Sequence, residues 1–166
     1  MTKDPIHQID TLTQSLIRFQ SVHGNAHEIR RCAKFVEDYL TSAGAEVHRI
    51  EHENTPSLLV LPREGYAPVL LMSHIDVVSA EPEQFQPFEK DGKLYGRGSL
   101  DDKYAVALSL VLLSKHLGEM LHQGRGQKDL PFGLLITSDE EMGGFRGAGR
   151  LQKTLDNRLA HQRRHP

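Results

Sequence analysis

The sequence predicts an α/β domain with a mostly parallel sheet. Two patterns carry this prediction: segments in which apolar residues recur at helical spacing alternate with short apolar runs bounded by Pro, Gly or Asn. A chain of 166 residues is long enough for one domain with a substantial core and too short for two ordinary ones. Apolar residues make up 38% and charged residues 25% of the chain, a profile typical of soluble globular proteins.

Apolar stripes predict four helices. The first two cover about residues 5–20 and 29–43, and Gly44 ends the second because glycine tolerates the left-handed backbone conformation there. The segment 102–117 is apolar on most of its circumference, so we expect a helix that is buried between the sheet and another layer. A glycine-rich turn then opens a last helix near residues 146–155.

Short apolar runs predict four strands, at residues 45–50, 57–61, 69–72 and 132–137. The segment 79–98 is rich in Pro, Glu, Gln and Gly and predicts a long surface loop with a short strand near Leu94. A second loop is predicted at 118–131. These loops separate the four strands from the helices without any internal repeat.

Net charge, cysteine content and the lack of long apolar segments indicate which partners and which cellular compartment to expect. The formal net charge of −2 argues against a nucleic-acid or membrane-surface partner. A single cysteine, Cys32, cannot form an internal disulfide, and it falls on a helical stripe as a core residue would. The N-terminus shows no apolar signal region, and the most apolar run, 105–113, is too short to span a bilayer. We therefore expect a cytoplasmic protein.

Histidine and carboxylate residues follow the third and fourth predicted strands. His74 and Asp76 come directly after the third strand, and Glu140 and Glu141 follow the fourth. Asp101 ends a glycine-containing loop at the start of the apolar helix. Because ligand-binding groups in an α/β sheet lie beyond the carboxyl ends of its strands, three separate segments are expected to meet at one edge.

The residue types at this edge suit a metal site. Imidazole and carboxylate groups are ligands for zinc, with cobalt or manganese as lesser alternatives. Asp76 is placed to orient the His74 imidazole, and Asp101 could bridge two metal ions with its two oxygens. Glu141 as a ligand and Glu140 as a general base would give adjacent acids different tasks.

Each segment alone also has a simpler interpretation. His74 and Asp76 could form an ordinary surface pair, and the glycines at 96 and 98 could form a plain turn. Asp101 could be the N-cap of the helix that follows, and the acidic run 139–141 could be a solvated face. Only the convergence of the three segments favours the metal site.

Three segments resemble the signatures of the M20 metallopeptidase family: Met72 to Asp76, Tyr95 to Lys103 and Thr137 to Glu141. They occur in the family's order, and the resemblance covers most of residues 5–155. That family includes aminoacylases, carboxypeptidases, succinyl-diaminopimelate desuccinylase and acetylornithine deacetylase. The resemblance implies a three-layer α/β sandwich with a mostly parallel mixed sheet flanked by helices.

The resemblance also implies roles for the site residues. His74 would bind one metal ion, Asp101 would bridge two, Glu141 would bind the second, Asp76 would orient His74 and Glu140 would be the general base. The complete site would hold two Zn²⁺ ions, or Co²⁺ or Mn²⁺. The implied reaction is hydrolysis of an amide bond beside a carboxylate, with a small peptide or N-acyl amino acid as substrate. A homo-oligomer is an open alternative to a single chain.

The sequence departs from the family pattern in two respects. Tyr104 follows Lys103 where the family usually has glycine, which is expected to reshape the floor of the site. A further acidic ligand, a final histidine ligand and the lid domain are expected to be missing. We therefore interpret residues 1–155 as the N-terminal part of a catalytic domain and 156–166 as a basic tail outside the family fold.

Two alternatives to a working hydrolase follow from these departures. The chain could be a non-catalytic remnant that acts as an interaction module, or the product of a truncated or frame-shifted gene. For the hydrolase in this incomplete form we expect weak metal binding through His74, Asp101 and Glu141, and an apolar sheet edge that promotes association. Other histidines carry less weight: His23 with His27 and His161 with His165 have metal-pair spacing, but Arg31 stands where an HExxH motif needs its second histidine.

Overall fold

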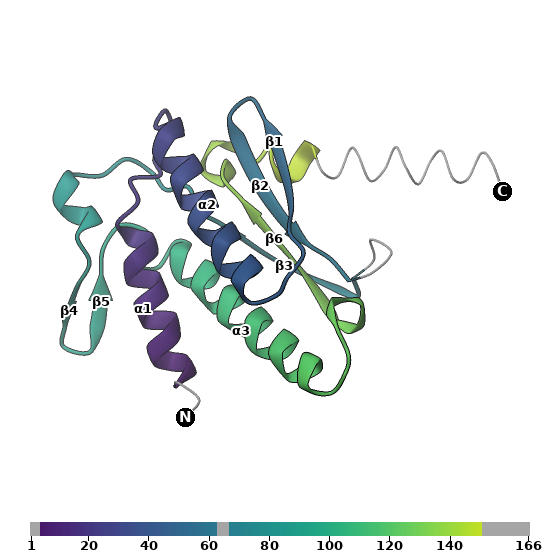
Figure 1. Ribbon diagram of the computed structural model, residues 1–166. Coiled ribbons are helices and arrows are strands. Elements are labelled where there is room, and N and C mark those ends of the chain that lie inside the picture. The colour runs from purple at the N-terminus through teal and green to yellow at the C-terminus, as the bar shows by residue number, and fades with distance from the viewer. Residues whose placement is uncertain (1–3, 63–66, 151–166) are drawn as a thin grey trace.

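Three long helices pack against a four-stranded sheet in the computed structural model of the chain (Figure 1). The structure describes residues 4–62 and 67–150. The helices are α1 (Pro5–Ile17), α2 (Ala26–Ser42) and α3 (Lys103–His122). This arrangement confirms the predicted α/β class and the three long helices within the described ranges.

Helix boundaries follow capping residues more closely than apolar stripes. Asp4 caps α1 through a bond from the Ile6 amide, and Asn25 caps α2 through a bond from the Glu28 amide. The α2 helix therefore starts three residues before the predicted stripe. Gly44 adopts a positive φ of 88° just after α2, which confirms its predicted role.

The main sheet has the strand order β1-β2-β6-β3. Its strands are β1 (His48–His52), β2 (Thr55–Val60), β3 (Val69–His74) and β6 (Phe132–Thr137). Only β3 and β6 are parallel, whereas β1 pairs antiparallel with β2 and β2 pairs antiparallel with β6. The sheet is mixed, as predicted, but the prediction that it is mostly parallel is wrong for the part of the chain that the structure describes.

A tight hairpin explains part of this difference. His52 pairs with Thr55, so Glu53 and Asn54 alone connect β1 to β2, and both adopt positive φ angles, of 47° and 65°. Two-residue turns of this kind join antiparallel strands. A second hairpin joins β4 (Phe88–Lys90) to β5 (Lys93–Tyr95) through Asp91 and Gly92, and β5 is the short strand predicted near Leu94.

The core lies between the helices and one face of the sheet. Fully buried core residues come from the three long helices and from β2 and β6: Leu16, Val36, Leu40, Leu58, Leu110, Leu113, Leu134 and Ile136. Cys32 is buried in the same cluster, and burial raises the pKa of its thiol to about 12. A thiol in this state is a core residue and not a nucleophile, as predicted.

The α3 helix is long and apolar enough to cross a membrane by composition, although the predicted apolar run was shorter. Such composition is also that of a core helix, and Val106, Leu110 and Leu117 are buried against the rest of the molecule. We therefore describe α3 as a core helix.

The opposite face of the sheet is partly open among the described residues. Leu71 packs into the core, so its neighbours Leu70 and Met72 lie on the other face, where they are 40% and 57% exposed. The third layer implied by the family resemblance is therefore not seen in residues 4–62 and 67–150. Of the helix predicted near 146–155, residues 148–150 are helical, and the rest lies outside the described residues.

Candidate metal centre

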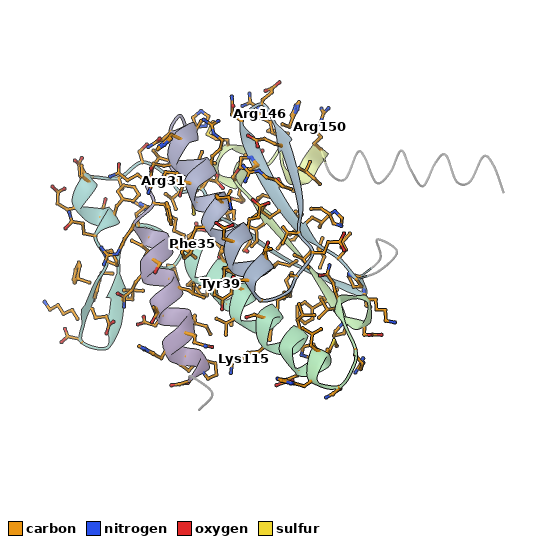
Figure 2. All side chains as sticks on the ribbon, viewed as in Figure 1. Arg31, Phe35, Tyr39, Lys115, Arg146 and Arg150 are labelled. Atoms are coloured by element: carbon orange, nitrogen blue, oxygen red, sulfur yellow. The ribbon has the colours of Figure 1, made fainter. Side chains whose placement is uncertain are left out.

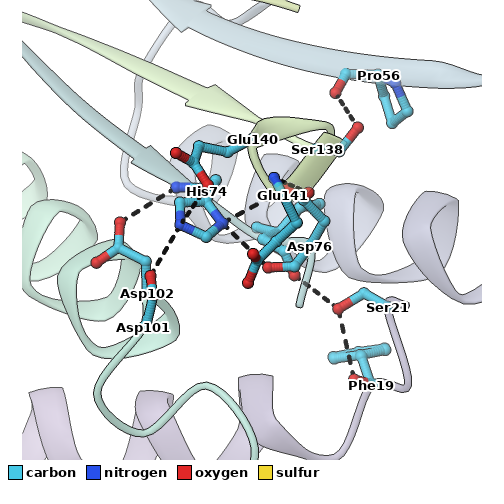
Figure 3. A network of polar contacts seen from close by, with 11 residues as sticks. Phe19, Ser21, Pro56, His74, Asp76, Asp101, Asp102, Ser138, Glu140 and Glu141 are labelled. Atoms are coloured by element: carbon cyan, nitrogen blue, oxygen red, sulfur yellow. Dashed lines mark hydrogen bonds and ion pairs between the residues drawn. The ribbon is translucent and has the colours of Figure 1, made fainter. Parts of the chain in front are cut away.

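The parallel pairing of β3 with β6 brings two of the three motifs together. His74, the last residue of β3, is the register partner of Thr137, the last residue of β6. Asp76 lies two residues beyond β3, and the acidic run 139–141 begins two residues beyond β6. Both motifs therefore leave the sheet at the same edge, as predicted from their position after buried strands (Figure 3).

His74 stands at the centre of the site. Its Nδ1 lies 3.0 Å from the backbone oxygen of Asp76 and 3.4 Å from Asp76 Oδ1. On the other side of the ring, Nε2 lies 3.1 Å from Asp101 Oδ1 and 3.7 Å from Glu140 Oε2. One ring nitrogen is thus held by Asp76, while the other faces carboxylates from two distant segments (Figure 3).

The electrostatic surroundings favour a positive charge at this position. Burial alone would lower the pKa of His74, but the carboxylate and carbonyl of Asp76, with the charge of Asp102, outweigh it and raise the pKa to about 9. A group of anions that stabilises an imidazolium also attracts a metal cation. A bound cation would replace the imidazole proton, since histidine binds metals in its neutral form.

Asp101 and Asp102 contact different parts of His74. The helix α3 begins at Lys103 with Asp102 at the N-cap position, so the alternative in which Asp101 is the N-cap is wrong. Asp101 is largely exposed and faces His74, and a cis peptide bond joins it to Asp102. Asp102 Oδ2 accepts a bond of 3.3 Å from the His74 amide, and burial raises the pKa of Asp102.

The three consecutive acids of the third motif point to different partners. Asp139 is buried, and its Oδ2 accepts bonds from the backbone amides of Arg146 and Gly147 at 2.7 and 3.0 Å. Glu140 is largely exposed and approaches His74. Glu141 donates its backbone amide to Asp76 Oδ2 at 3.0 Å. Asp76 therefore contacts both the imidazole of the first motif and the backbone of the third.

Sequence reasoning missed two of these residues. Asp102 contacts the His74 backbone and Asp139 holds the glycine-rich turn, but neither was singled out. The only sequence signal was the mutual repulsion of acids in the run 139–141, which does not show which acid turns inward. Tyr104 lines a cavity with Ile6 and Leu100, and its expected effect on the floor of the site stays a prediction.

The ligands are only partly assembled. In residues 4–62 and 67–150 no three His, Cys, Asp or Glu side chains are arranged as a metal-binding cluster. The side chains of His74 and Asp101 are in direct contact. The hydrogen bond between Glu141 and the site is made by its backbone amide and not by its carboxylate. His161 and His165 lie outside the described residues. The donor types fit zinc, and the described part of the chain supplies an incomplete set of them.

A cavity of about 530 Å³ adjoins the site behind Asp76. Asp76 and Asp139 both line it, and one carboxylate oxygen of each, Oδ1, lacks a hydrogen-bond partner within the described part of the chain. The cavity reaches the β1–β2 hairpin, where Arg146 Nε lies 3.0 Å from Glu53 Oε2 (Figure 2). His23 also lines this cavity.

Comparisons with known sequences point to one family of peptidases. Residues 70–164, more than half of the chain, match peptidase family M20/M25/M40. The succinyl-diaminopimelate desuccinylase of Blochmanniella floridana is 31% identical over 167 residues, which cover 94% of this chain and 41% of the relative. That of Thioalkalivibrio sulfidiphilus is 33% identical over 155 residues, or 89% of this chain and 39% of the relative.

Solved structures share the fold. Human carnosine dipeptidase 1 matches with a TM-score of 0.64 and 22% identity, over 85% of this chain and 34% of that one. The M20 family metallo-carboxypeptidase Sso-CP2 of Sulfolobus solfataricus matches with a TM-score of 0.62 and 18% identity, over 82% and 32%. The fold is therefore that of metallopeptidase catalytic domains.

The chain belongs to peptidase family M20/M25/M40, a family of hydrolases. It spans about two fifths of the length of the curated relatives it matches. The family match begins inside β3 and reaches residue 164, so it contains all three motifs. His74, Asp101 and Glu141 all fall within it. The boundary between residues 155 and 156 stays a prediction.

Proposed function

We propose that this chain carries the N-terminal part of the catalytic domain of a metal-dependent hydrolase that cleaves an amide bond beside a carboxylate. The observation that supports it most is the geometry at His74 Nε2, which lies 3.1 Å from Asp101 and 3.7 Å from Glu140 where two parallel strands end. Zinc is the proposed metal, with Co²⁺ or Mn²⁺ as substitutes.

The proposed ligands are His74, Asp101 and Glu141. Bound zinc would supply Lewis-acid polarisation and make a water molecule more acidic. The backbone oxygen of Asp76 accepts a hydrogen bond from Nδ1 of His74, so Nε2 would present its lone pair to the metal once it has lost its proton. Glu140 is exposed beside Nε2, where its carboxylate can take a proton from an attacking water as general base.

The proposed substrates are small peptides or N-acyl amino acids. Relatives named as desuccinylases and structural neighbours named as a dipeptidase and a metallo-carboxypeptidase support this class. The formal charge of −2 supports the proposal that neither nucleic acid nor a membrane surface is a partner, and the single cysteine supports a cytoplasmic protein. A homo-oligomer is proposed as a way to cover the open sheet face near Met72.

A second candidate is a protein of this family without hydrolase activity. It is favoured by one observation: the described residues contain no assembled cluster of three metal-binding side chains. Catalytic zinc is usually held by three protein ligands, so a site built from His74 and Asp101 alone would bind metal weakly.

Metal content and turnover test the proposal. We expect purified protein to bind zinc or cobalt, and Asp101→Asn and Glu141→Ala each to reduce the bound metal, as measured by elemental analysis after dialysis. Hydrolysis of N-acyl amino acids and dipeptides is then assayed with added zinc or cobalt. Metal content unchanged by both substitutions would exclude the ligand assignment, and metal binding without turnover would favour the second candidate.

A further inference from the structure

The end of α1 and the start of its link to α2, residues 16–22, contact two of the three motifs, and we call this segment the connection. This connection is itself firmly packed. The ring of Phe19 lies 5.6 Å from the ring of Phe35, and the guanidinium of Arg31 lies 5.6 Å above the Phe19 ring. Arg31 and Phe35 lie one helical turn apart on α2 (Figure 2). Their contacts with Phe19 fix the position of the connection, so that it can support the site.

Ser21 joins this connection to the first motif. Its side chain is fully buried, and its Oγ donates a hydrogen bond of 2.6 Å to the backbone oxygen of Ile75, between His74 and Asp76 (Figure 3). The backbone oxygen of Ser21 accepts a bond of 3.1 Å from the Val77 amide. The Ile75 amide donates to Thr137 of β6 at 2.9 Å. Segment 75–77 is therefore held between the sheet and the connection.

Lys103 joins the same connection to the second motif. Its side chain is fully buried, and Nζ donates bonds of 2.9 and 2.7 Å to the backbone oxygens of Leu16 and Phe19. A buried ammonium group is costly unless it is hydrogen-bonded. The Leu16 and Phe19 oxygens supply acceptors, although the Leu16 oxygen also accepts a bond of 3.2 Å from the Phe19 amide. These bonds hold the lysine side chain in place.

The loop that carries Asp101 rests on this lysine. The Lys103 amide donates to the Gly98 oxygen at 2.9 Å, and a Cβ at Gly98 would come within 2.8 Å of Lys103 Cδ. A Cβ at Gly96 would come within 2.7 Å of Ile17 Cγ2. The loop therefore lies in direct contact with both the lysine stem and the end of α1.

We infer that Ser21 and Lys103 are positioning residues that attach the His74 segment and the Asp101 loop to one connection, and so set the distance between His74 Nε2 and the Asp101 carboxylate. Both side chains bond to backbone oxygens, and neither residue is a proposed metal ligand. Because the two segments are attached to the same seven residues, a shift of the connection moves both. This inference rests on the metal site of the proposed function.

Amide hydrogen exchange of the metal-free chain tests the attachment itself. Ser21→Ala removes one buried hydroxyl, and Thr13→Val is the matched control, because the buried Thr13 hydroxyl bonds only to Ile9 of its own helix. We expect Ser21→Ala to raise exchange at residues 75–77 roughly fivefold, the effect of one buried hydrogen bond, while Thr13→Val leaves it unchanged. Equal exchange in the two variants would overturn the inference for Ser21.

Lys103→Met tests the second attachment, because methionine keeps the stem and removes the ammonium group. We expect faster exchange at both residues 16–22 and 98–102. A change confined to α3 would overturn the inference for Lys103. If this variant does not fold, Ser21→Ala with its control decides whether the connection supports the site.

Cobalt binding tests the consequence for the site. Affinity is measured by competition with a chromophoric chelator, and the visible spectrum of bound Co²⁺ reports its coordination. We expect Ser21→Ala and Lys103→Met to weaken binding about 10-fold or more and to change the spectrum, while Thr13→Val leaves both as in the parent chain. Binding equal to that of the Thr13→Val control would overturn the inference. If the parent chain binds no cobalt, the proposed function fails, and exchange still decides the attachment.

Discussion

The carboxylate and the carbonyl of Asp76 contact two different motifs. The carbonyl and Oδ1 face His74 Nδ1, and Oδ2 accepts the bond from the Glu141 amide. A single buried acid therefore orients the imidazole and fixes where the third motif begins. This double task explains why a carboxylate is buried at this position, where an unpaired charge would be costly.

The first prediction concerns Asp76→Asn. Removing the negative charge should lower the pKa of His74 from about 9 towards 6.5, because burial then opposes protonation with less compensation. Metal affinity should fall about 10- to 100-fold. The pKa is measured from the NMR shifts of the His74 ring. An unchanged His74 pKa in Asp76→Asn would contradict this prediction and attribute the raised pKa to the other carboxylates.

The second prediction concerns the pH dependence of stability without metal. The folded-state pKa of His74 is raised above its ordinary value of 6.5, so its contribution is complete below pH 6.5 and is lost as pH rises through about 9. The stability difference between the parent chain and His74→Gln should therefore shrink across this range. Urea unfolding at pH 6, 7.5 and 9 measures it. A difference that grows with pH would contradict the raised pKa.

At the scale of elements, β6 is the strand on which the site is built. It is buried along its whole length, it pairs with β2 and β3, and its end delivers the acidic run. Gly133 allows close packing in it, since a Cβ there would come within 2.9 Å of the Val60 oxygen and of Leu61 Cδ2. A backbone contact of this kind cannot move away cheaply.

The third prediction compares Gly133→Ala with Gly118→Ala. The first should lower the free energy of unfolding by about 1–3 kcal/mol, because the strand is overpacked. The second should raise it by about 0.5–1 kcal/mol, because a Cβ at Gly118 meets nothing within 4 Å in α3 and alanine favours a helix. Chemical denaturation measures both. Equal effects of the two substitutions would contradict the packing described for β6.

At the scale of the whole molecule, the described sheet ends in a free, apolar edge. The strand order places β3 at one side, and Val69 and Met72 on it are more than half exposed. Unpaired edge strands and apolar patches promote association. The association expected from the sequence stays a prediction, and this edge is the surface at which we expect it.

The fourth prediction concerns Val69→Lys, which places a charge on this edge. Self-association, measured by analytical ultracentrifugation across a concentration series, should decrease, because lysine on an edge strand opposes edge-to-edge pairing. Ile6→Lys is the control, since Ile6 is also exposed but lies on α1. An equal decrease in both variants would attribute the effect to net charge and not to the β3 edge.

Local patterns predicted the elements well and the strand directions less well. The stripes of α1, α2 and α3 and the buried run of β6 follow from periodicity, which depends only on neighbours in the sequence. The hairpin at Asp91 and Gly92 had a local signal, since Asp-Gly is typical of such turns. The hairpin at Glu53 and Asn54 lacks a glycine, and the antiparallel pairing that it imposes was missed.

The sequence by itself determined the family, the three motifs and the edge at which two of them meet, because motif order and position after apolar strands are local properties. Only the tertiary structure decided how Asp76 reaches Glu141, which acid of 139–141 turns inward, and how Ser21 and Lys103 support the site. These contacts join residues 7 to 87 positions apart, and hydrogen bonds over such separations depend on how the chain packs. The roles of the metal ligands stay predictions.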